Sequence, residues 1–310
     1  MSRYLAIDFG GTRSRAALFD DELRLIRRAE TLSRVSDGPD IVLDRLIALG
    51  KSLTDADGDP AAIGIAAPGP LDTAAGLIIK AETLPGWSQA PIAGTLSQAF
   101  AGVPAFVEND ANLGAIAEYH LGAGRGADPM IYLTISTGIG GGAIIKGELF
   151  TGSDGHAIEP GHMRLTLPDG SIRRWEELAS GTALGEWARH RLATGVAPSV
   201  LRESEAIDGQ AVGEAALAGD EFALACLRHA GSWLGLGLVN LLHLFNPAAI
   251  VLGGSVMKLG DLILDPARQV IEEHILFEGF TSRDLLRPAR FGDDVCLVGA
   301  ALHARQRAEL

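Results

Sequence analysis

The chain has 310 residues, of which 47% are hydrophobic and 21% are charged. This balance is typical of a folded protein with one large domain or two ordinary ones, and it excludes a small disulfide scaffold and a disordered chain. The formal net charge of −13 has the wrong sign for a surface that binds nucleic-acid phosphates or anionic lipids, so a small-molecule partner is expected and neither nucleic acid nor membrane is.

The cysteine content and the N-terminus indicate a reducing, cytoplasmic setting. The two cysteines, Cys226 and Cys296, lie far apart and have no histidine at metal-binding spacing, which argues against a disulfide framework and a thiol zinc cluster. The N-terminal strand reaches Asp8 before a signal-like apolar run forms, so export is not expected. The most apolar stretch, residues 231–245, is shorter than the roughly 20 residues of a membrane span and predicts a buried helix.

Apolar patterning predicts strands that alternate with helices along the chain. In the first part, strands are predicted over residues 3–9, 15–19, 63–67 and 105–107, and helices over 41–53, 92–100 and 111–120. Further on, strands are predicted over 130–135, 142–146 and 248–252, with the buried helix over 231–245 before the last of them. This alternation predicts an α/β fold.

The chain shows no Pro/Ser-rich linker, so the domain boundary is expected inside a structured crossover near residues 118–124. The predicted N-terminal domain covers residues 1–118 and the C-terminal domain covers 119–297, with a helix at about 298–310 packing back on the first domain. A pattern of strand, glycine turn and strand occurs at Asp8–Thr12 and again at Ser136–Gly141. This repeat predicts that the two halves of the chain use the same strand–turn–strand motif.

Both glycine turns are candidate phosphate-binding loops. Glycines without a Cβ let main-chain N–H groups approach an anion, and a neighbouring hydroxyl adds a donor. A plain glycine hairpin is the alternative for either turn alone, but the presence of one turn in each half favours phosphate. The candidate nucleotide-binding residues are Gly10, Gly11 and Thr12 in the first turn and Thr137, Gly138 and Gly140 in the second.

Asp8 lies at the end of a predicted buried strand, where a carboxylate is costly unless a cation or a donor meets it. It is a candidate Mg²⁺ ligand through a water molecule.

The chain lacks the Walker pattern, and its glycine turns lead into strands, so neither a Walker loop nor a Rossmann fingerprint is supported. A third glycine turn, at Gly253 and Gly254, follows the late apolar strand, where an adenosine moiety would fit; a simple tight turn is the alternative.

Residues Glu108–Asn112 place two acids and two amides at a strand-to-helix junction. One of them is expected to cap the helix, but capping does not require all four. Asp110 is the candidate general base that takes a proton from a hydroxyl as it attacks a phosphoryl group, and Asn109 is a candidate to orient the acceptor.

A second polar group follows the second glycine turn. Glu159, His162 and Glu176 combine carboxylates with an imidazole, a composition that suits the hydroxyls of a sugar. A structural role is the alternative for a single histidine, and it is the interpretation kept for the other histidines. Trp175 is interpreted as a core residue.

Taken together, these residues resemble the ROK family of sugar kinases, within the superfamily that holds actin and hexokinase. The resemblance spans nearly the whole chain. It rests on Asp8–Thr12, Ala67–Gly69, Leu84–Trp87, Glu108–Asn112, Thr137–Gly141, Glu159–His162, Glu176 with Ala179–Thr182, and Asn246 with Leu252–Gly254.

The resemblance implies two ribonuclease-H-like (actin-like ATPase) domains with ATP, Mg²⁺ and sugar in an interdomain cleft, and a homodimer. It implies that Asp110 is the catalytic base and that Asn109, Glu159, His162 and Glu176 contact sugar hydroxyls, with Gly69 counted among the substrate-binding positions.

Two departures from the family pattern stand out. The family commonly binds a structural zinc through the histidine at the position of His162 and three cysteines before the position of Glu176, yet residues 163–175 contain no cysteine. Zinc is therefore not expected, and Leu165, Leu167, Ile172 and Trp175 are expected to hold this segment by packing. Thr83 stands where sugar kinases of the family often have asparagine, which leaves the identity of the sugar open.

The favoured function is an ATP-dependent hexose kinase that acts on a hydroxyl, with C6 of glucose favoured and N-acetylhexosamine, fructose and allose left open. The alternatives are a sugar-responsive transcriptional regulator of the same family and a sugar sensor without catalysis.

Overall fold

The computed structural model describes residues 2–54, 58–80, 84, 86–280 and 284–309. By its internal contacts the chain divides into two compact units. The first consists of Met1–Gly122, Leu149–Ala157 and Arg290–Leu310, and the second of Ala123–Glu148 and Ile158–Ala289.

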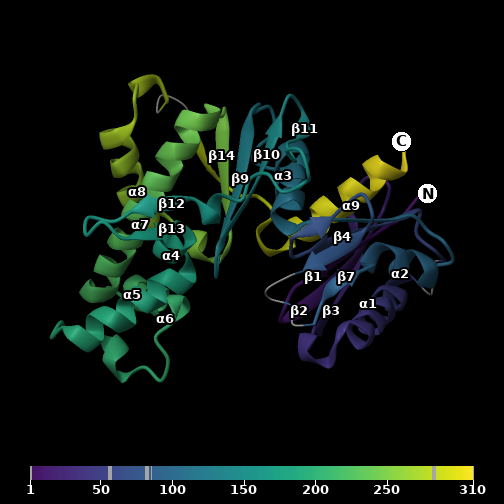
Figure 1. The fold of residues 1–310 in the computed structure, drawn as a ribbon, viewed down its shortest axis with the longest axis horizontal. Helices are drawn as coiled ribbons and strands as arrows, with labels where there is room; N and C mark the ends of the chain where they lie inside the picture. Colours follow the sequence, from purple (N-terminus) through teal and green to yellow (C-terminus); the bar gives the residue numbers. More distant parts are fainter. Residues whose placement is uncertain (1, 55–57, 81–83, 85, 281–283, 310) are drawn as a thin grey trace. The chain divides into compact units, whose positions relative to one another are not determined.

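A five-stranded mixed sheet with the order β3-β2-β1-β4-β8 forms the centre of the first unit, as far as the chain is described (Figure 1). The central strand β1 pairs antiparallel with β2 and parallel with β4, and its residues are almost all buried, as expected for a strand inside a sheet. The strands are β1 (Tyr4–Phe9), β2 (Arg13–Phe19), β3 (Leu25–Leu32), β4 (Ala62–Ala67) and β8 (Ala105–Asn109).

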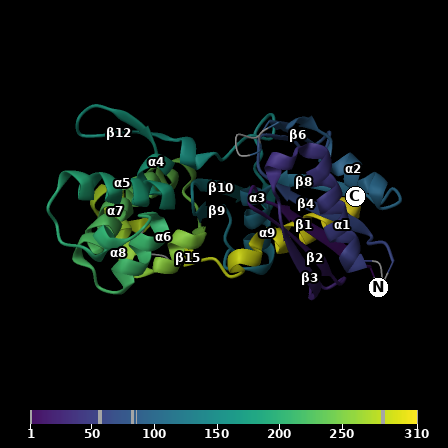
Figure 2. The same cartoon turned by 90° about the horizontal axis from the view of Figure 1, so that it is seen from below.

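Helices cover both faces of this sheet (Figure 2). On one face, α1 (Pro39–Thr54) and α2 (Ile92–Ala99) bury leucines and isoleucines against Leu5 and Ile7. On the other face lie α3 (Asp110–Leu121) and α9 (Val295–Ala308), which pack on each other and, for α9, on β1 and β4. A smaller sheet of β5 (Leu71–Asp72), β6 (Leu77–Lys80) and β7 (Ser88–Ala90) completes the unit.

The second unit repeats the strand order of the first. Its sheet runs β11-β10-β9-β14-β15, with β9 antiparallel to β10 and parallel to β14. The strands are β9 (Met130–Ile135), β10 (Ile139–Ile145), β11 (Glu148–Leu149), β14 (Ala249–Gly253) and β15 (Leu286–Pro288). A separate hairpin is formed by β12 (Arg164–Thr166) and β13 (Ile172–Arg174). The predicted α/β class is confirmed by these mixed sheets and their helices.

The helices of the second unit are α4 (Glu176–Ala179), α5 (Gly181–Thr194), α6 (Gly209–Leu217), α7 (Glu221–Phe245) and α8 (Asp261–His274). Helix α7 has 25 residues, because it begins at the Asp220 cap, upstream of the predicted 231–245. The argument that this helix is too short to span a membrane is therefore wrong. Among the described residues it is the one helix that is long and apolar enough to cross a membrane. However, 61% of its most apolar 18-residue segment is buried inside the fold, as in the core helix of a folded domain.

Several strands differ from their predicted limits. Strand β10 begins at Ile139 and not at 142, and β2 begins at Arg13. Strand β3 was not predicted, because it lies at the sheet edge and most of its side chains are exposed, which leaves no apolar alternation to detect.

The C-terminal helix α9 and the chain before it pack in the first unit, where the fully buried Glu118 of α3 holds them. One oxygen of Glu118 accepts the main-chain N–H groups of Arg290 (2.8 Å) and Phe291 (3.1 Å). The predicted domain limits placed residues 149–157 and 290–297 in the second domain, whereas their contacts lie in the first unit. The hydrogen bonds of Glu118 account for the position of residues 290 and 291.

We predict that Gly64→Ala destabilises the protein by about 1–3 kcal/mol, because a Cβ on Gly64 of β4 would overlap the carbonyl group of Ala300 in α9. Thermal or urea unfolding measures the loss. Gly94→Ala is the matched control: Gly94 is exposed inside α2 with open space around it, and alanine there raises helix stability by up to about 1 kcal/mol. Equal effects of the two substitutions would contradict the packing of α9 on β4.

Candidate active site

The first glycine turn closes the β1–β2 hairpin, and hydrogen bonds that involve two buried serines hold it in place. The N–H of Gly10 donates to the carbonyl of Arg13 (3.1 Å). Ser33 donates its main-chain N–H to the carbonyl of Thr12 (2.9 Å) and its hydroxyl to the carbonyl of Gly10 (2.6 Å). The hydroxyl of Ser14 lies 2.8 Å from that of Ser33, and both residues are fully buried. The carbonyls of Gly10 and Thr12 are thus held by Ser33, while Gly11 is half-buried and Thr12 is exposed.

Asp8 at the end of β1 is paired with Arg15, its cross-strand neighbour on β2. Both Nε (3.0 Å) and Nη2 of Arg15 donate to Oδ2 of Asp8, and Nη1 of Arg15 donates to the carbonyl of Asp293 (2.6 Å). Burial raises the pKa of the Asp8 carboxyl, and the charge of Arg15 acts in the opposite direction. The cation that a buried carboxylate requires is therefore an arginine, which the sequence analysis did not identify.

The donor set around Asp8 is compatible with Mg²⁺ held through water. Both bonds from Arg15 fall on Oδ2, so they leave Oδ1 for a further partner. Mg²⁺ commonly keeps most of its waters and uses one or two carboxylates together with substrate phosphates. A single carboxylate fits such an ion and would not fit a metal that needs a complete cage of protein ligands.

Asn109 and Asp110 stand side by side where β8 passes into α3. Oδ1 of Asn109 accepts the N–H groups of Ala111 (2.9 Å) and Asn112 (3.4 Å), so the capping role is carried by Asn109. Its Nδ2 lies next to Gly69, 3.5 Å from the point where a Cβ would stand. Asp110 is exposed at the first position of the helix, and its Oδ1 accepts the N–H of Ala111 (2.7 Å). The structure thus brings Gly69, Asn109 and Asp110 together.

Glu108 lies behind this junction and is only 5% exposed. One of its oxygens, Oε1, accepts both the main-chain N–H of Asn109 (2.8 Å) and the side-chain amide of Asn112 (2.9 Å). Burial raises the pKa of the Glu108 carboxyl, although these two donors favour its charged form. The buried Oδ1 of Asn112 has no hydrogen-bond partner in the described part of the chain.

The second glycine turn spans only Ser136–Gly138, which the N–H of Ser136 closes on the carbonyl of Gly138 (2.9 Å). Gly140 pairs with Thr134 inside the sheet, so its placement in the turn is wrong. The glycine pattern does not show where the strand begins, because Gly140 and Gly141 adopt extended ladder conformations.

Three other segments approach the main chain of this turn closely, and each does so at a glycine. A Cβ on Gly254 would overlap the carbonyl of Ile135, one on Gly181 would stand 2.8 Å from the carbonyl oxygen of Ser136, and one on Gly161 would overlap the carbonyl of Ile139. The N–H of Gly181 donates to that Ser136 carbonyl (2.7 Å) and starts α5 there, with Ser180 as its cap. A helix N-terminus beside a glycine turn is a favourable place for phosphate.

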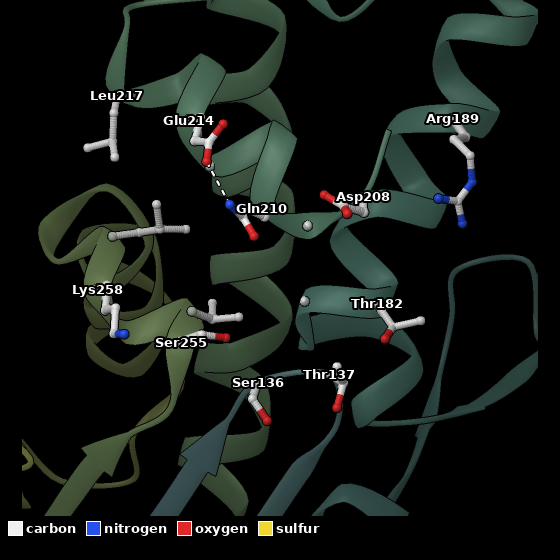
Figure 3. A pocket seen from close by; sticks show the side chains of 15 residues that line it. Ser136, Thr137, Thr182, Arg189, Asp208, Gln210, Glu214, Leu217, Ser255 and Lys258 are labelled. Carbon is white, nitrogen blue, oxygen red and sulfur yellow. Dashed lines mark hydrogen bonds between the residues drawn. The ribbon is translucent and has the colours of Figure 1, made fainter. Parts of the chain in front are cut away.

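A cavity of about 660 Å³ opens beside this turn (Figure 3). Thr137 and Thr182 lie at one end of it, and the polar side chains of α6, Gln210 and Glu214, are joined by a hydrogen bond of 2.8 Å on its wall. The 3-10 helix η4 (Ser255–Leu259) supplies Val256 and Leu259 opposite. The candidates Gly253 and Gly254 do not line the cavity themselves; the residues that follow them do. The complete lining is Ser136, Thr137, Gly181, Thr182, Arg189, Asp208, Gly209, Gln210, Gly213, Glu214, Leu217, Ser255, Val256, Lys258 and Leu259.

Glu176 lies next to the same turn, and Gly161, which stands between Glu159 and His162 in sequence, packs close to Glu176: a Cβ on Gly161 would stand 3.4 Å from the Cβ of Glu176. Glu159 directly precedes the 3-10 helix η2 (Pro160–His162) and His162 is its last residue; both are exposed, while Glu176 begins α4. Oε2 of Glu176 lies 2.8 Å from the Cβ position of Gly138, and its Oε1 is 2.9 Å from Nη1 of Arg174. The second unit therefore places the carboxylate of Glu176 next to a glycine turn, and Glu159 and His162 remain sugar-binding candidates.

The β12–β13 hairpin is held by some of the residues expected to hold it. Trp175 is fully buried and Leu165 packs against the core, but Ile172 is 59% exposed and does not contribute.

In the described part of the chain, no cluster of three or more His, Cys, Asp or Glu side chains is arranged to hold a metal ion. Thr83, on which the choice of sugar was expected to depend, lies outside the described residues.

The comparisons with known proteins extend over nearly the whole chain. The model of the ROK family matches residues 4–307. The glucokinase of Streptomyces coelicolor is 33% identical over 99% of this chain and 98% of its own length. The crystal structure of a ROK family glucokinase from Streptomyces griseus in complex with glucose and AMPPNP is 33% identical, covers 98% of this chain and 100% of that one, and gives a TM-score of 0.83. The xylose repressor of Bacillus subtilis is 29% identical over 85% of this chain and 67% of its own length.

We predict that Glu108→Gln stabilises the protein at neutral pH and that the gain disappears in acid. A carboxyl whose pKa is raised by folding contributes stability below its ordinary pKa, and this contribution is lost as the pH rises through the raised value. Glutamine stays neutral, accepts the same two donors and offers an N–H to Asn112. Thermal unfolding between about pH 4 and 7 measures the difference. Glu148→Gln, at an exposed position, is the control, and a gain independent of pH would contradict the explanation.

We predict that the purified protein contains far less than one zinc per chain, because residues 163–175 lack the cysteines that a zinc site there would need. Elemental analysis after purification without chelators measures the content. A stoichiometric zinc content would contradict this prediction.

Proposed function

The chain belongs to the ROK family, and we propose that it is an ATP-dependent sugar kinase that phosphorylates a hexose hydroxyl, with C6 of glucose favoured. One observation carries the proposal: the exposed acid Asp110 stands beside Asn109 and Gly69 in one unit. In the other unit a glycine turn borders both a large cavity and the carboxylate of Glu176. The names of the relatives with about 33% identity, which are glucokinases, support the same function.

We further propose that each unit is a ribonuclease-H-like domain of the actin-like ATPase type. The common strand order of the two sheets supports this, as do the antiparallel glycine hairpins β1–β2 and β9–β10 at equivalent places in them. In both units the first strand of the hairpin also pairs in parallel with a later strand, β4 or β14.

The proposed reaction transfers the γ-phosphoryl group of ATP to the sugar. Asp110 accepts the proton of the attacking hydroxyl, the sugar oxygen forms a bond to the γ-phosphorus, and the bond from that phosphorus to the bridging oxygen of ADP breaks. Asp110 suits this role because it is exposed, and Asn109 beside it fixes the start of α3. The developing charge on the phosphoryl oxygens meets the main-chain N–H groups of the turns and the N-terminus of α5. When bound, Mg²⁺ neutralises phosphate charge, and Asp8 would hold it through water.

The cavity beside Thr137 supports a nucleoside triphosphate as the donor. Its apolar residues, such as Val256 and Leu259, suit the faces of a nucleobase, and its polar residues suit ribose hydroxyls and base edges. Glu159, His162 and Glu176 are proposed as the groups that hold the sugar, since carboxylates accept bonds from vicinal hydroxyls. A cytoplasmic location and a homodimer are proposed with the kinase function.

Similarity to the xylose repressor of Bacillus subtilis favours a second candidate, a protein that senses sugar without phosphorylating it. The two functions differ in one measurable property. A sensor binds sugar but releases no ADP, whereas a kinase does both.

We predict that Asp110→Asn lowers kcat by roughly 10²–10⁴-fold and leaves sugar affinity nearly unchanged, because the amide cannot take the proton. Coupled ADP release over a panel of hexoses, amino sugars and polyols measures turnover, and calorimetry measures binding. Asp40→Asn is the matched control, since Asp40 is also an exposed acid in the first turn of a helix of the first unit.

Undiminished turnover by the Asp110→Asn variant would show that another group is the base. Sugar binding by the wild-type protein without ADP release on any member of the panel would favour the sensor over the kinase.

A further inference from the structure

Trp175 occupies the point where the hairpin that follows His162 meets the helix that begins with Glu176. It lies between β13 and α4, and its side chain is fully buried although the residues around it in the hairpin are largely exposed. Ile172 is 59% exposed, and Arg164, Thr166 and Arg173 are exposed as well. Most of the hairpin therefore gains little from packing, and Trp175 is its largest buried anchor.

The main chain of Trp175 connects the two sugar-binding candidates of this unit. Its N–H donates to the carbonyl of Met163 (2.8 Å), the residue directly after His162. Its carbonyl accepts the N–H groups of Leu178 (3.0 Å) and Ala179 (3.1 Å) and so forms the first turn of the helix that carries Glu176. A displacement of Trp175 would therefore move His162 and Glu176 together.

The side chain of Trp175 attaches this connection to the core helix α7. Its Nε1–H donates to the main-chain carbonyl of Trp233 (2.9 Å). One turn further along α7, Gly237 leaves the space that the indole occupies, since a Cβ there would overlap Cε2, Cζ2 and Nε1 of Trp175. Glycine is disfavoured inside a helix, so a glycine at this contact is explained by the close approach of the ring.

We propose that Trp175 is a positioning residue for the sugar: its bond to Trp233 and its seat on Gly237 set the places of His162 and Glu176. The inference rests on the proposed sugar kinase function. It adds a determinant of sugar affinity that touches neither the sugar nor the nucleotide cavity, whose lining does not include Trp175.

The first test is Trp175→Phe, which keeps an aromatic ring and removes the N–H donor. Loss of one such hydrogen bond changes an equilibrium constant by about tenfold, so KM and Kd for the sugar should rise by about that factor. KM for ATP should change by less than about twofold, and kcat at saturating sugar should be retained, because Asp110 is untouched. Trp187→Phe is the matched control: Trp187 lies on α5 of the same unit, is half-buried, and stacks on His229 with ring centroids 4.5 Å apart.

The second test is a double-mutant cycle with Gly237→Ala. Alone, Gly237→Ala should displace the indole and raise the sugar KM, although alanine favours the helix itself. In the Trp175→Phe background it should add less, because the smaller phenylalanine ring has no atom at Cζ2 and no bond to Trp233 that fixes it, so it can move away from the new Cβ. The cycle is read both in sugar KM and in the thermal midpoint.

A merely structural role predicts a different pattern. If Trp175→Phe lowers the thermal midpoint but leaves sugar KM and Kd at wild-type values, the positioning role is overturned while the kinase function stands. If sugar KM and ATP KM rise equally, or if the Gly237→Ala effect on KM is the same in both backgrounds, the inference is also overturned. If the wild-type protein neither binds nor phosphorylates any sugar of the panel, the proposed function fails first and the inference fails with it.

Discussion

The need to match buried carboxylates with donors organises the first unit. Asp8 is paired with Arg15 across the β1–β2 hairpin, Glu108 receives an amide and a main-chain N–H at the start of α3, and Glu118 holds the main chain at Arg290 and Phe291. An unmatched charge at any of these places would be expensive. The three acids consequently hold, in order, the hairpin of the first glycine turn, the junction at Asp110, and the chain that leads into α9.

The second unit relies on close main-chain approach instead of buried charge. Gly161, Gly181 and Gly254 belong to three different segments, and each packs against a carbonyl between Ile135 and Ile139. Next to the turn at Ser136–Gly138 lie Glu176, a sugar-binding candidate, and the cavity lined by Thr137 and Thr182. A side chain at any of these glycines would push its segment away from the turn. The arrangement of the segments around Ser136–Gly138 therefore depends on the absence of a Cβ at these three positions.

The fold and the candidate residues were largely predictable because their signals are local. Alternating apolar runs showed most strands, the glycine turns and Asp8 followed directly from short motifs, and Asn109 is a cap because asparagine before a helix accepts orphan N–H groups. Arg15, Ser33 and the lining residue Gln210 were missed. Their roles come from neighbours that lie across a strand pair or in another helix, and Arg15 shows its role only once the register places it opposite Asp8. Likewise, the limits of β10 and α7 were misjudged where glycines or mixed polarity weakened the pattern.

The sequence by itself determined the α/β class, the repeated glycine hairpin and the set of polar residues from which a site is built, because strand periodicity, turn chemistry and side-chain chemistry are encoded in short stretches. Only the tertiary structure decided which partner each of these residues has. Ion pairs such as Asp8 with Arg15, and contacts such as Trp175 with Gly237, join positions brought together by strand register and helix packing, and distances between such positions are not written in any local segment of the chain.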